Sequence, residues 1–329
     1  MNSHYRIFYV ASSILVAWII FVNYHYINLF GGDPEIHLIF AKNLIAGNWF
    51  EFNPGIKSGG ETSPLYMLIV SLYLLIAGDY AQYLMKATGV ISLVATAILI
   101  YKATPNTVSN NRIILCLIFA SMTFVQYQSQ RGMENFLFAA LITYVIHRYY
   151  SNDPPTNFVL PPLVVSLYLL RPEAVFLAIW LFLRALLKKD RRLLIAALIS
   201  IISIIAIYKT LNLFLGLESH SAGSIRALTS AWKSTEINIG NFNLYLNKKP
   251  LIAFLHAIPI FLLIFLKRKS FNKTDIVTLA VFVALPIFLH ILNILPNTHV
   301  SRYVLYCYVI LFYVFSAKIL KNVKMSHLL

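Results

Sequence analysis

Residues 193–217 read LLIAALISIISIIAIYKTLNLFLGL, an apolar run in which Lys209 is the only charged residue. Such a run matches the ~20 apolar residues that a helix needs to cross the ~30 Å hydrocarbon core of a bilayer. Residues 7–22 and 276–295 form two more runs without a charged residue. Shorter apolar segments cover residues 64–77, 81–101, 113–125, 135–146, 158–187, 251–266 and 303–320. Because backbone groups in lipid must be satisfied internally and no alternating barrel pattern is present, the sequence predicts an all-α, polytopic membrane helical bundle of about 10–11 transmembrane helices.

The composition also indicates that lipid is the solvent of this chain. Of its 329 residues, 59% are hydrophobic and 12% are charged, whereas soluble domains are about 25% charged. The net charge of +15 gathers in short segments beside helix ends, at residues 184–192, 267–273 and 318–324. This pattern is typical of cytoplasmic loops, so we predict no nucleic-acid partner. Cys116 and Cys307 both fall inside predicted helices, which argues against a disulfide framework.

The charge pattern orients the chain in the membrane. With a cytoplasmic N-terminus and an uncleaved first helix, residues 31–63 form a first external loop and residues 218–249 a second one. Residues 64–112 leave two alternatives open: one of their apolar segments is a half-helix, or the basic loop that follows breaks the charge rule. We predict a single domain, residues 1–329, that crosses a bacterial or archaeal cell membrane several times and works on the extracytoplasmic side.

The first external loop is acidic in an otherwise basic chain. Four of the 12 acidic residues lie in it: Asp33, Glu35, Glu51 and Glu61. Asp33 is a favourable helix N-cap, Pro34 suits the first helical position, and Gly47 suits the C-terminal cap. An apolar stripe follows at helical spacing: Ile36, Phe40 and Leu44. We therefore predict a short amphipathic helix that lies flat on the membrane surface.

A carboxylate in this position also suits catalysis. Asp33 follows a membrane helix, where a carboxylate is well placed to accept a proton from a hydroxyl group. Capping is the commoner use of such a residue, and the two roles are compatible. Asp33, Glu35 and His37 alternate in sequence, but residues two apart do not share a face of a helix. We predict no metal site and no cofactor, and leave the use of a divalent cation open.

Several short motifs follow one another along the chain. Asp33 is followed by FAKNL at residues 40–44, FNPG at 52–55 and TSPLY at 62–66. Further along stand SQRGME at 129–134, LRPE at 170–173 and SRY at 301–303. Together they resemble the C-type (GT-C) glycosyltransferases, and most of all the branch with arabinofuranosyltransferases and related bacterial polyprenyl-phosphate-sugar enzymes. The resemblance spans roughly residues 7–320, and the order of the motifs is more specific than any one of them.

The resemblance implies a GT-C fold and a reaction. A sugar on a polyprenyl phosphate would pass, with inversion, to a hydroxyl of an extracytoplasmic glycan or glycolipid. Such a reaction needs a base for the acceptor and cations for the departing phosphate. Asp33 is the candidate base, and Glu35 is considered as a second catalytic carboxylate. The candidate phosphate-binding residues are the external cations Lys42, Arg131, Arg171, His299 and Arg302. Glu134 and Glu173 are candidates for orienting the arginines, and an ion pair with either acid is the structural alternative for Arg171.

Two other functions stay open. A transporter or flippase of lipid-linked sugars would use the same intramembrane arginines and the same lipid groove. A non-catalytic GT-C relative is suggested by Gly32, because the family's external loop usually begins with two adjacent acids and this chain has Gly32-Asp33. We also expect these 329 residues to lack the large C-terminal extracytoplasmic domain that is common in larger members of the family they resemble. Residues 218–249 are long and polar enough to cover an acceptor.

Overall fold

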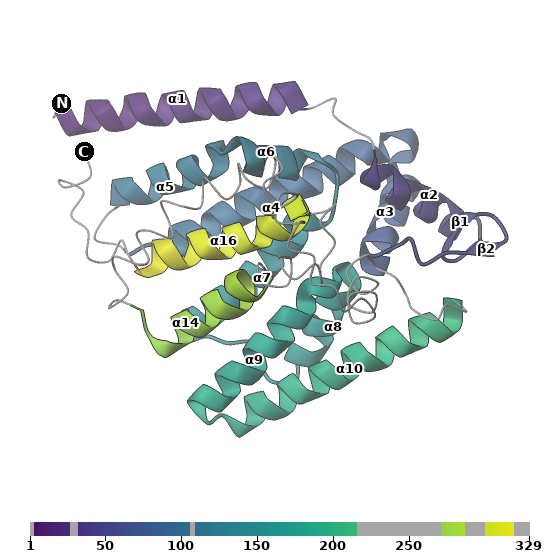
Figure 1. Ribbon diagram of the computed structural model, residues 1–329. Helices are drawn as coiled ribbons and strands as arrows, with labels where there is room; N and C mark the ends of the chain where they lie inside the picture. Colours follow the sequence, from purple (N-terminus) through teal and green to yellow (C-terminus); the bar gives the residue numbers. More distant parts are fainter. Residues whose placement is uncertain (1–2, 27–31, 106–108, 216–270, 287–299, 319–329) are drawn as a thin grey trace, which may run out of the picture.

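The computed structural model describes residues 3–26, 32–105, 109–215, 271–286 and 300–318 (Figure 1). The predicted second external loop, residues 218–249, and the predicted helix at 251–266 lie outside the described residues, as does part of the predicted helix at 276–295. The described part is mostly helical, which confirms the all-α prediction at this level.

Within the described residues, the apolar segments of the sequence fall in helices. The helices are α1 (Ser3–Tyr26), α2 (Asp33–Ile45), α3 (Pro64–Ala77), α4 (Ala81–Ala103), α5 (Ser109–Ser121), α6 (Thr123–Gln130), α7 (Asn135–Tyr150), α8 (Leu160–Leu170), α9 (Val175–Lys188), α10 (Arg191–Leu215), α14 (Lys273–Leu279) and α16 (Val300–Lys318). Short 3-10 helices occupy Gly78–Tyr80 and Pro172–Ala174, and a π-helix occupies Ala280–Ala284. The strands β1 (Glu51–Asn53) and β2 (Ile56–Lys57) form an antiparallel hairpin between α2 and α3.

Among the described residues, two helical segments are long and apolar enough to cross a membrane: Pro64–Ala103 and Arg191–Leu215. A third candidate is Arg112–Ser121 together with Thr123–Ser129, if this pair, bent by 68°, counts as one span. Shorter apolar helices cover Ser12–Tyr26, Leu160–Leu170 and Leu305–Lys318. The structure is thus compatible with a membrane protein, and the expected 10–11 crossings stay a prediction.

The helices pack around α7. Figure 1 shows α1 along one edge over α5 and α6, α10 along the opposite edge, and α4, α7 and α16 between them. Phe136, Phe138 and Ile142 of α7 are fully buried, and the ring of Phe138 packs edge-on against Tyr306 of α16 at 5.9 Å. The core therefore holds α7 and α16 against each other.

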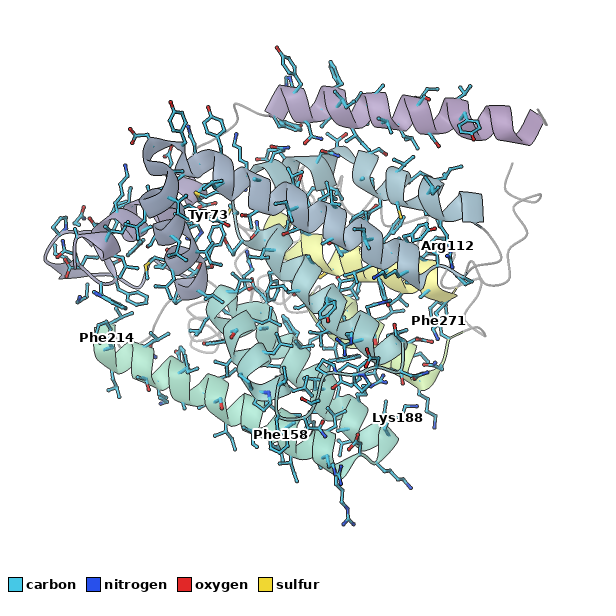
Figure 2. All side chains as sticks on the ribbon, turned by 180° about the vertical axis from the view of Figure 1, so that it is seen from behind. Tyr73, Arg112, Phe158, Lys188, Phe214 and Phe271 are labelled. Atoms are coloured by element: carbon cyan, nitrogen blue, oxygen red, sulfur yellow. The ribbon has the colours of Figure 1, made fainter. Side chains whose placement is uncertain are left out.

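The two ends of the bundle differ in charge. Figure 2 shows Lys188, at the end of α9, and Phe214, near the end of α10, at opposite ends of the molecule. The basic junction between α9 and α10 therefore lies far from the end of α10, where α2 and the hairpin stand (Figure 1). The acidic first loop and the basic segment at residues 184–192 lie at opposite ends of the described structure.

Gly89 allows α4 to approach the end of α6 closely. A Cβ atom at this position would overlap the backbone carbonyl oxygen of Ser129. In an ordinary helix Gly→Ala stabilises by up to ~1 kcal/mol. We expect Gly89→Ala instead to destabilise the protein by about 1–3 kcal/mol, because the backbone has to shift.

Thermal unfolding in detergent tests this expectation. Gly60→Ala is the matched control, since its new Cβ would meet the side-chain oxygen of Ser58 at 3.2 Å, and a side chain can rotate away. An unfolding temperature for Gly89→Ala equal to or above that of the wild type would contradict the close approach.

Candidate functional site

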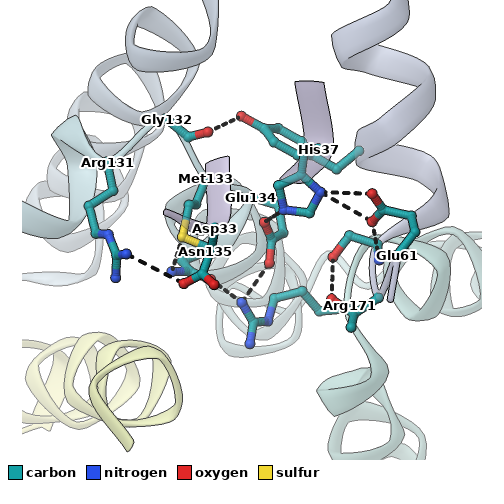
Figure 3. Close-up of polar contacts among 12 residues, drawn as sticks. Asp33, His37, Glu61, Arg131, Gly132, Met133, Glu134, Asn135 and Arg171 are labelled. Atoms are coloured by element: carbon teal, nitrogen blue, oxygen red, sulfur yellow. Dashed lines mark hydrogen bonds and ion pairs between the residues drawn. The ribbon is translucent and has the colours of Figure 1, made fainter. Parts of the chain in front are cut away.

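Three segments outside the α-helices meet inside the bundle (Figure 3). Residues 131–134 separate α6 from α7, and Gly132 has a φ of +69°. Residues 171–174 separate α8 from α9, and Arg171 has an extended backbone with φ −156° and ψ 134°. The third segment, residues 61–63, precedes α3. In an apolar bundle, irregular backbone is tolerated where protein buries it or where it lines a cavity, so such a meeting point is a candidate site.

The buried guanidinium of Arg171 is the centre of this site. Its side chain is 6% exposed and lies 2.7 Å from Glu134 Oε1 and 2.7 Å from Glu173 Oε1. Arg171 Nε donates a further bond to Glu173 Oε2 at 3.0 Å, which completes a two-pronged pair, and another nitrogen bonds Asn135. The two carboxylates compensate the buried charge. Glu134 and Glu173 thus contact the arginine that they were predicted to orient, and Arg171 is committed to protein partners.

His37 joins this centre to the first loop. Its Nδ1 lies 3.0 Å from Glu61 Oε2, and its Nε2 lies 3.1 Å from Glu134 Oε2. Glu61 also accepts a bond from the backbone nitrogen of Ser63 at 2.7 Å. Carboxylates accept hydrogen bonds when ionised, so a ring that faces one on each side needs a proton on both nitrogens. This position between two carboxylates favours the imidazolium form of His37, which connects α2 with the segment before α3 and with the start of α7.

The charges shift the pKa values of both groups. Burial lowers the pKa of His37, but Glu61 and Glu134 outweigh burial and raise it to about 10. Burial raises the pKa of Glu134, but Arg171 and His37 outweigh burial and lower it to about 2. Both groups are thus charged at neutral pH, and the cluster is held by ion pairs.

We expect the imidazolium of His37 to make stability depend on alkaline pH. Its pKa is higher in the folded state than its usual 6.5, so its contribution is complete below about pH 6.5 and is lost as the pH rises through about 10. The unfolding temperature of the wild type should therefore decrease as the pH rises from about 6.5 to about 10. In His37→Gln this pH dependence of the unfolding temperature should be weaker. His25→Gln, at an exposed position of α1, is the control and should keep it. An unchanged slope in His37→Gln would mean that another group titrates.

Asp33 and Arg131 form a second, more accessible pair beside this cluster. Arg131 lies 3.4 Å from Asp33 Oδ2, and their side chains are 19% and 30% exposed. The guanidinium also stacks over the ring of Tyr127 at 5.7 Å. A carboxylate that solvent can reach is able to take a proton, and a neighbouring cation is able to bind an anion. Of the two predicted catalytic residues, Asp33 is the one whose carboxylate lies beside a cation and is accessible to solvent.

The caps of α2 differ by one residue from the prediction. Gly32, with a φ of +76°, occupies the N-cap position, and Asp33 is the first helical residue. The prediction of Asp33 as the N-cap was therefore wrong, because a glycine can adopt the left-handed backbone that the entry into this helix requires. At the other end Ala46 is the C-cap, and Gly47, with a φ of +86°, follows it. The carboxylate of Asp33 contacts Arg131 from this first helical position.

The remaining predicted residues lie away from the cluster or outside the described side chains. Glu35 and Lys42 are exposed on α2. His299 lies outside the described residues, and Arg302 belongs to the first turn of α16, where the side chain is not among those described. The structure therefore brings together Asp33, Arg131, Glu134, Arg171 and Glu173.

Sequence reasoning missed His37 and Glu61. Asp33 and His37 are four residues apart on α2 and therefore share a face of the helix, and this spacing was the available signal. The predicted stripe at Ile36 and Phe40 is also shifted, because the buried face of α2 includes Pro34, His37, Phe40 and Ala41. Glu61 carries no local signal beyond its charge, since its partner His37 lies 24 residues away.

The described residues contain no group of three or more His, Cys, Asp and Glu side chains that could hold a metal ion. Both cysteines are free in the described structure. Comparisons with models of protein families, with curated proteins and with solved structures found no match to this chain.

Proposed function

We propose that this chain is a membrane-embedded glycosyltransferase of the C type that uses a polyprenyl-phosphate sugar as donor. The acceptor is a hydroxyl of an extracytoplasmic glycan or glycolipid, and the general base is Asp33. The observation that carries the proposal is the partly exposed ion pair of Asp33 and Arg131 beside a buried cluster of charges. A buried cluster of charges is costly, and groups with strongly shifted pKa values gather at functional sites.

The positions of the family-like motifs support the proposal. Asp33 comes from the first motif, Arg131 and Glu134 come from SQRGME, and Arg171 and Glu173 come from LRPE. These segments are up to about 140 residues apart along the chain, and yet their charged side chains form one set of contacts. Three motifs with unrelated structural roles would have no reason to meet in one place.

In the proposed mechanism, the ion pair of Asp33 and Arg131 performs the reaction, and the buried cluster around Arg171 holds it in place. Asp33 takes the proton of the acceptor hydroxyl, and the oxygen attacks the anomeric carbon from the side opposite the phosphate. A bond forms between this oxygen and the anomeric carbon while the bond from that carbon to the phosphate oxygen breaks. The electron pair leaves with the polyprenyl phosphate, whose charge Arg131 compensates. Arg171, held by two carboxylates, fixes the start of α7 next to Arg131.

Exposed apolar surface supports the membrane part of the proposal. On α10, large side chains at helical spacing are exposed, among them Ile195, Ile202 and Leu213 at 58%, 64% and 83%. A stripe of this kind faces lipid in a membrane helix and would be unfavourable in water. We propose a multi-pass position in the cell membrane with α2 on the extracytoplasmic side, and this surface and the basic junction between α9 and α10 support it.

The direct test is turnover by the purified chain in detergent. We expect it to release polyprenyl phosphate from at least one member of a panel of polyprenyl-phosphate sugars when a glycan or glycolipid acceptor is present, at a rate proportional to enzyme concentration. Omission of the acceptor should slow this release, because the base then has no hydroxyl to deprotonate. A panel in which no donor is consumed, with protein that is monodisperse and unfolds cooperatively, would sink the proposal and favour a non-catalytic relative.

A second candidate function is transport of lipid-linked sugars. It is favoured by the break between α5 and α6, where the chain bends by 68° at Met122, and by the irregular backbone at residues 171–174. Transporters place substrates at interrupted helices of this kind. In proteoliposomes, a transporter would move a fluorescent lipid-linked sugar between leaflets without releasing polyprenyl phosphate, whereas the proposed enzyme would release it.

A further inference from the structure

The hairpin of β1 and β2 exposes an unusual amount of apolar surface. It protrudes from the bundle beside the end of α10 (Figure 1). Trp49, Phe52 and Ile56 are 51%, 37% and 64% exposed. Large apolar side chains gathered on a small protruding element are unfavourable in water, and they mark a surface that contacts another apolar phase.

The charges of the hairpin cancel each other. Lys57 Nζ lies 3.2 Å from Glu51 Oε1 and donates a bond to the carbonyl oxygen of Trp49 at 2.6 Å. Glu51 also accepts a bond from the backbone nitrogen of Gly55 at 2.6 Å. Each charge is thus compensated within the hairpin, so the partner is selected by apolar contact and not by charge.

The hairpin is continuous with the apolar face of α10. The ring of Phe50 lies 6.2 Å from the ring of Phe214, and Lys57 Nζ lies 5.5 Å above the same ring. At a rise of 1.5 Å per residue, Phe214 is about 35 Å along the helix from Arg191. This length is close to the ~30 Å thickness of the hydrocarbon core. If Arg191 marks one boundary of the core, the hairpin stands at the other boundary.

We infer that the hairpin, residues 49–57, is an interfacial membrane anchor that places Trp49, Phe52 and Ile56 in the headgroup layer of the outer leaflet. Tryptophan is enriched at this depth because one part of its ring system is apolar and the other donates a hydrogen bond. The inference rests on the membrane embedding in the proposed function. It adds a specific contact with phospholipid that neither the apolar helices nor the charge cluster requires.

The anchor also bears on the candidate site. The side chain of Asn43 in α2 donates bonds to the backbone oxygens of Glu51 at 2.7 Å and Phe52 at 3.0 Å. The ring of Phe40 packs edge-on against Phe52 at 5.7 Å. The hairpin is therefore fastened to the helix that begins with Asp33. By fixing the depth of α2, it would keep the carboxylate at the level of phospholipid phosphates, where the phosphate of a lipid-linked donor also lies.

The test is the quenching of tryptophan fluorescence by brominated lipids in nanodiscs. The loss of tryptophan emission is measured for the wild type and for Trp49→Phe. The difference between the two losses is the quenching of Trp49 alone. Trp18→Phe gives the same difference for Trp18, which is 44% exposed on α1 and serves as the marker for a helix in the membrane. Bromine is placed either near the carbonyl groups of the lipid or deep in the acyl chains. The measurement is repeated with and without anionic lipid.

We expect shallow bromine to quench the emission of Trp49 strongly and deep bromine to quench it only slightly. This quenching should be the same in neutral and in anionic lipid. Trp18 should be quenched by bromine in the acyl chains. If Trp18 is quenched and Trp49 is not, the hairpin faces water or is covered by protein such as residues 218–249, and the anchor is overturned while the membrane embedding stands. If neither is quenched, the embedding itself fails, and the anchor and the proposed function fail with it.

Discussion

Asp33→Asn is expected to lower the rate of sugar transfer by about 10²–10⁴-fold, the usual contribution of a general base. Asparagine has nearly the same shape, but it is unable to accept the proton of the acceptor hydroxyl. The ion pair with Arg131 spans 3.4 Å between partly exposed groups, so its loss should cost at most about 1 kcal/mol of stability. The readout is the initial rate of polyprenyl phosphate release together with the unfolding temperature of the same preparation.

Two variants make this result specific. Asp79→Asn removes an exposed acid in the 3-10 turn between α3 and α4, and it should keep the rate of the wild type. Glu35→Gln tests the second predicted carboxylate, which lies exposed on the same helix as Asp33. Full activity in Asp33→Asn combined with loss in Glu35→Gln would move the base to Glu35. Full activity in both would exclude the two predicted catalytic carboxylates and contradict the proposed base.

The sequence predicted the helices well where a local signal existed. The apolar segment 64–77 coincides with α3, and the charged residues of Arg171-Pro172-Glu173 correctly mark the interruption between α8 and α9. The structural alternative for Arg171 is confirmed, because it pairs with both Glu134 and Glu173. These features follow from hydrophobicity and from the cost of an unpaired charge in an apolar bundle, which can be judged from the sequence.

The break at Met122 was not predictable in this way. It falls inside an apolar segment, residues 113–125, that reads as one uninterrupted helix. A break leaves backbone carbonyls without their helical donors. Here Trp18 of α1 donates to the carbonyl oxygen of Ser121 at 2.9 Å, and Gln126 donates to that of Ala120. The partner that permits the break lies 103 residues away, as the partner of His37 lies 24 residues away, and local patterns do not report such contacts.

Arg171→Met is expected to destabilise the protein by about 3–5 kcal/mol, the usual effect of removing one partner from a buried ion pair. Methionine fills most of the space, but it removes the arginine from Glu173 and leaves Glu134 with His37 alone, and these carboxylates are 3% and 1% exposed. The unfolding temperature in detergent is the measurement. Arg148→Met is the matched control, since Arg148 pairs with Asp153 at the surface, where the side chains are 30% and 72% exposed, and the loss should stay below about 1 kcal/mol.

The double variant Arg171→Met with Glu173→Met separates charge from packing. If unpaired charge causes the loss, removing the second carboxylate should restore part of the stability, because a buried pair is often replaceable by apolar side chains. If poorer packing causes the loss of stability, the losses of the two single variants should add in the double variant. Sugar transfer by the restored variant then decides the role of the cluster: a stable fold without activity would mean that Arg171 positions Arg131 and Asp33 for the reaction, whereas a stable and active enzyme would reduce the cluster to a structural clamp.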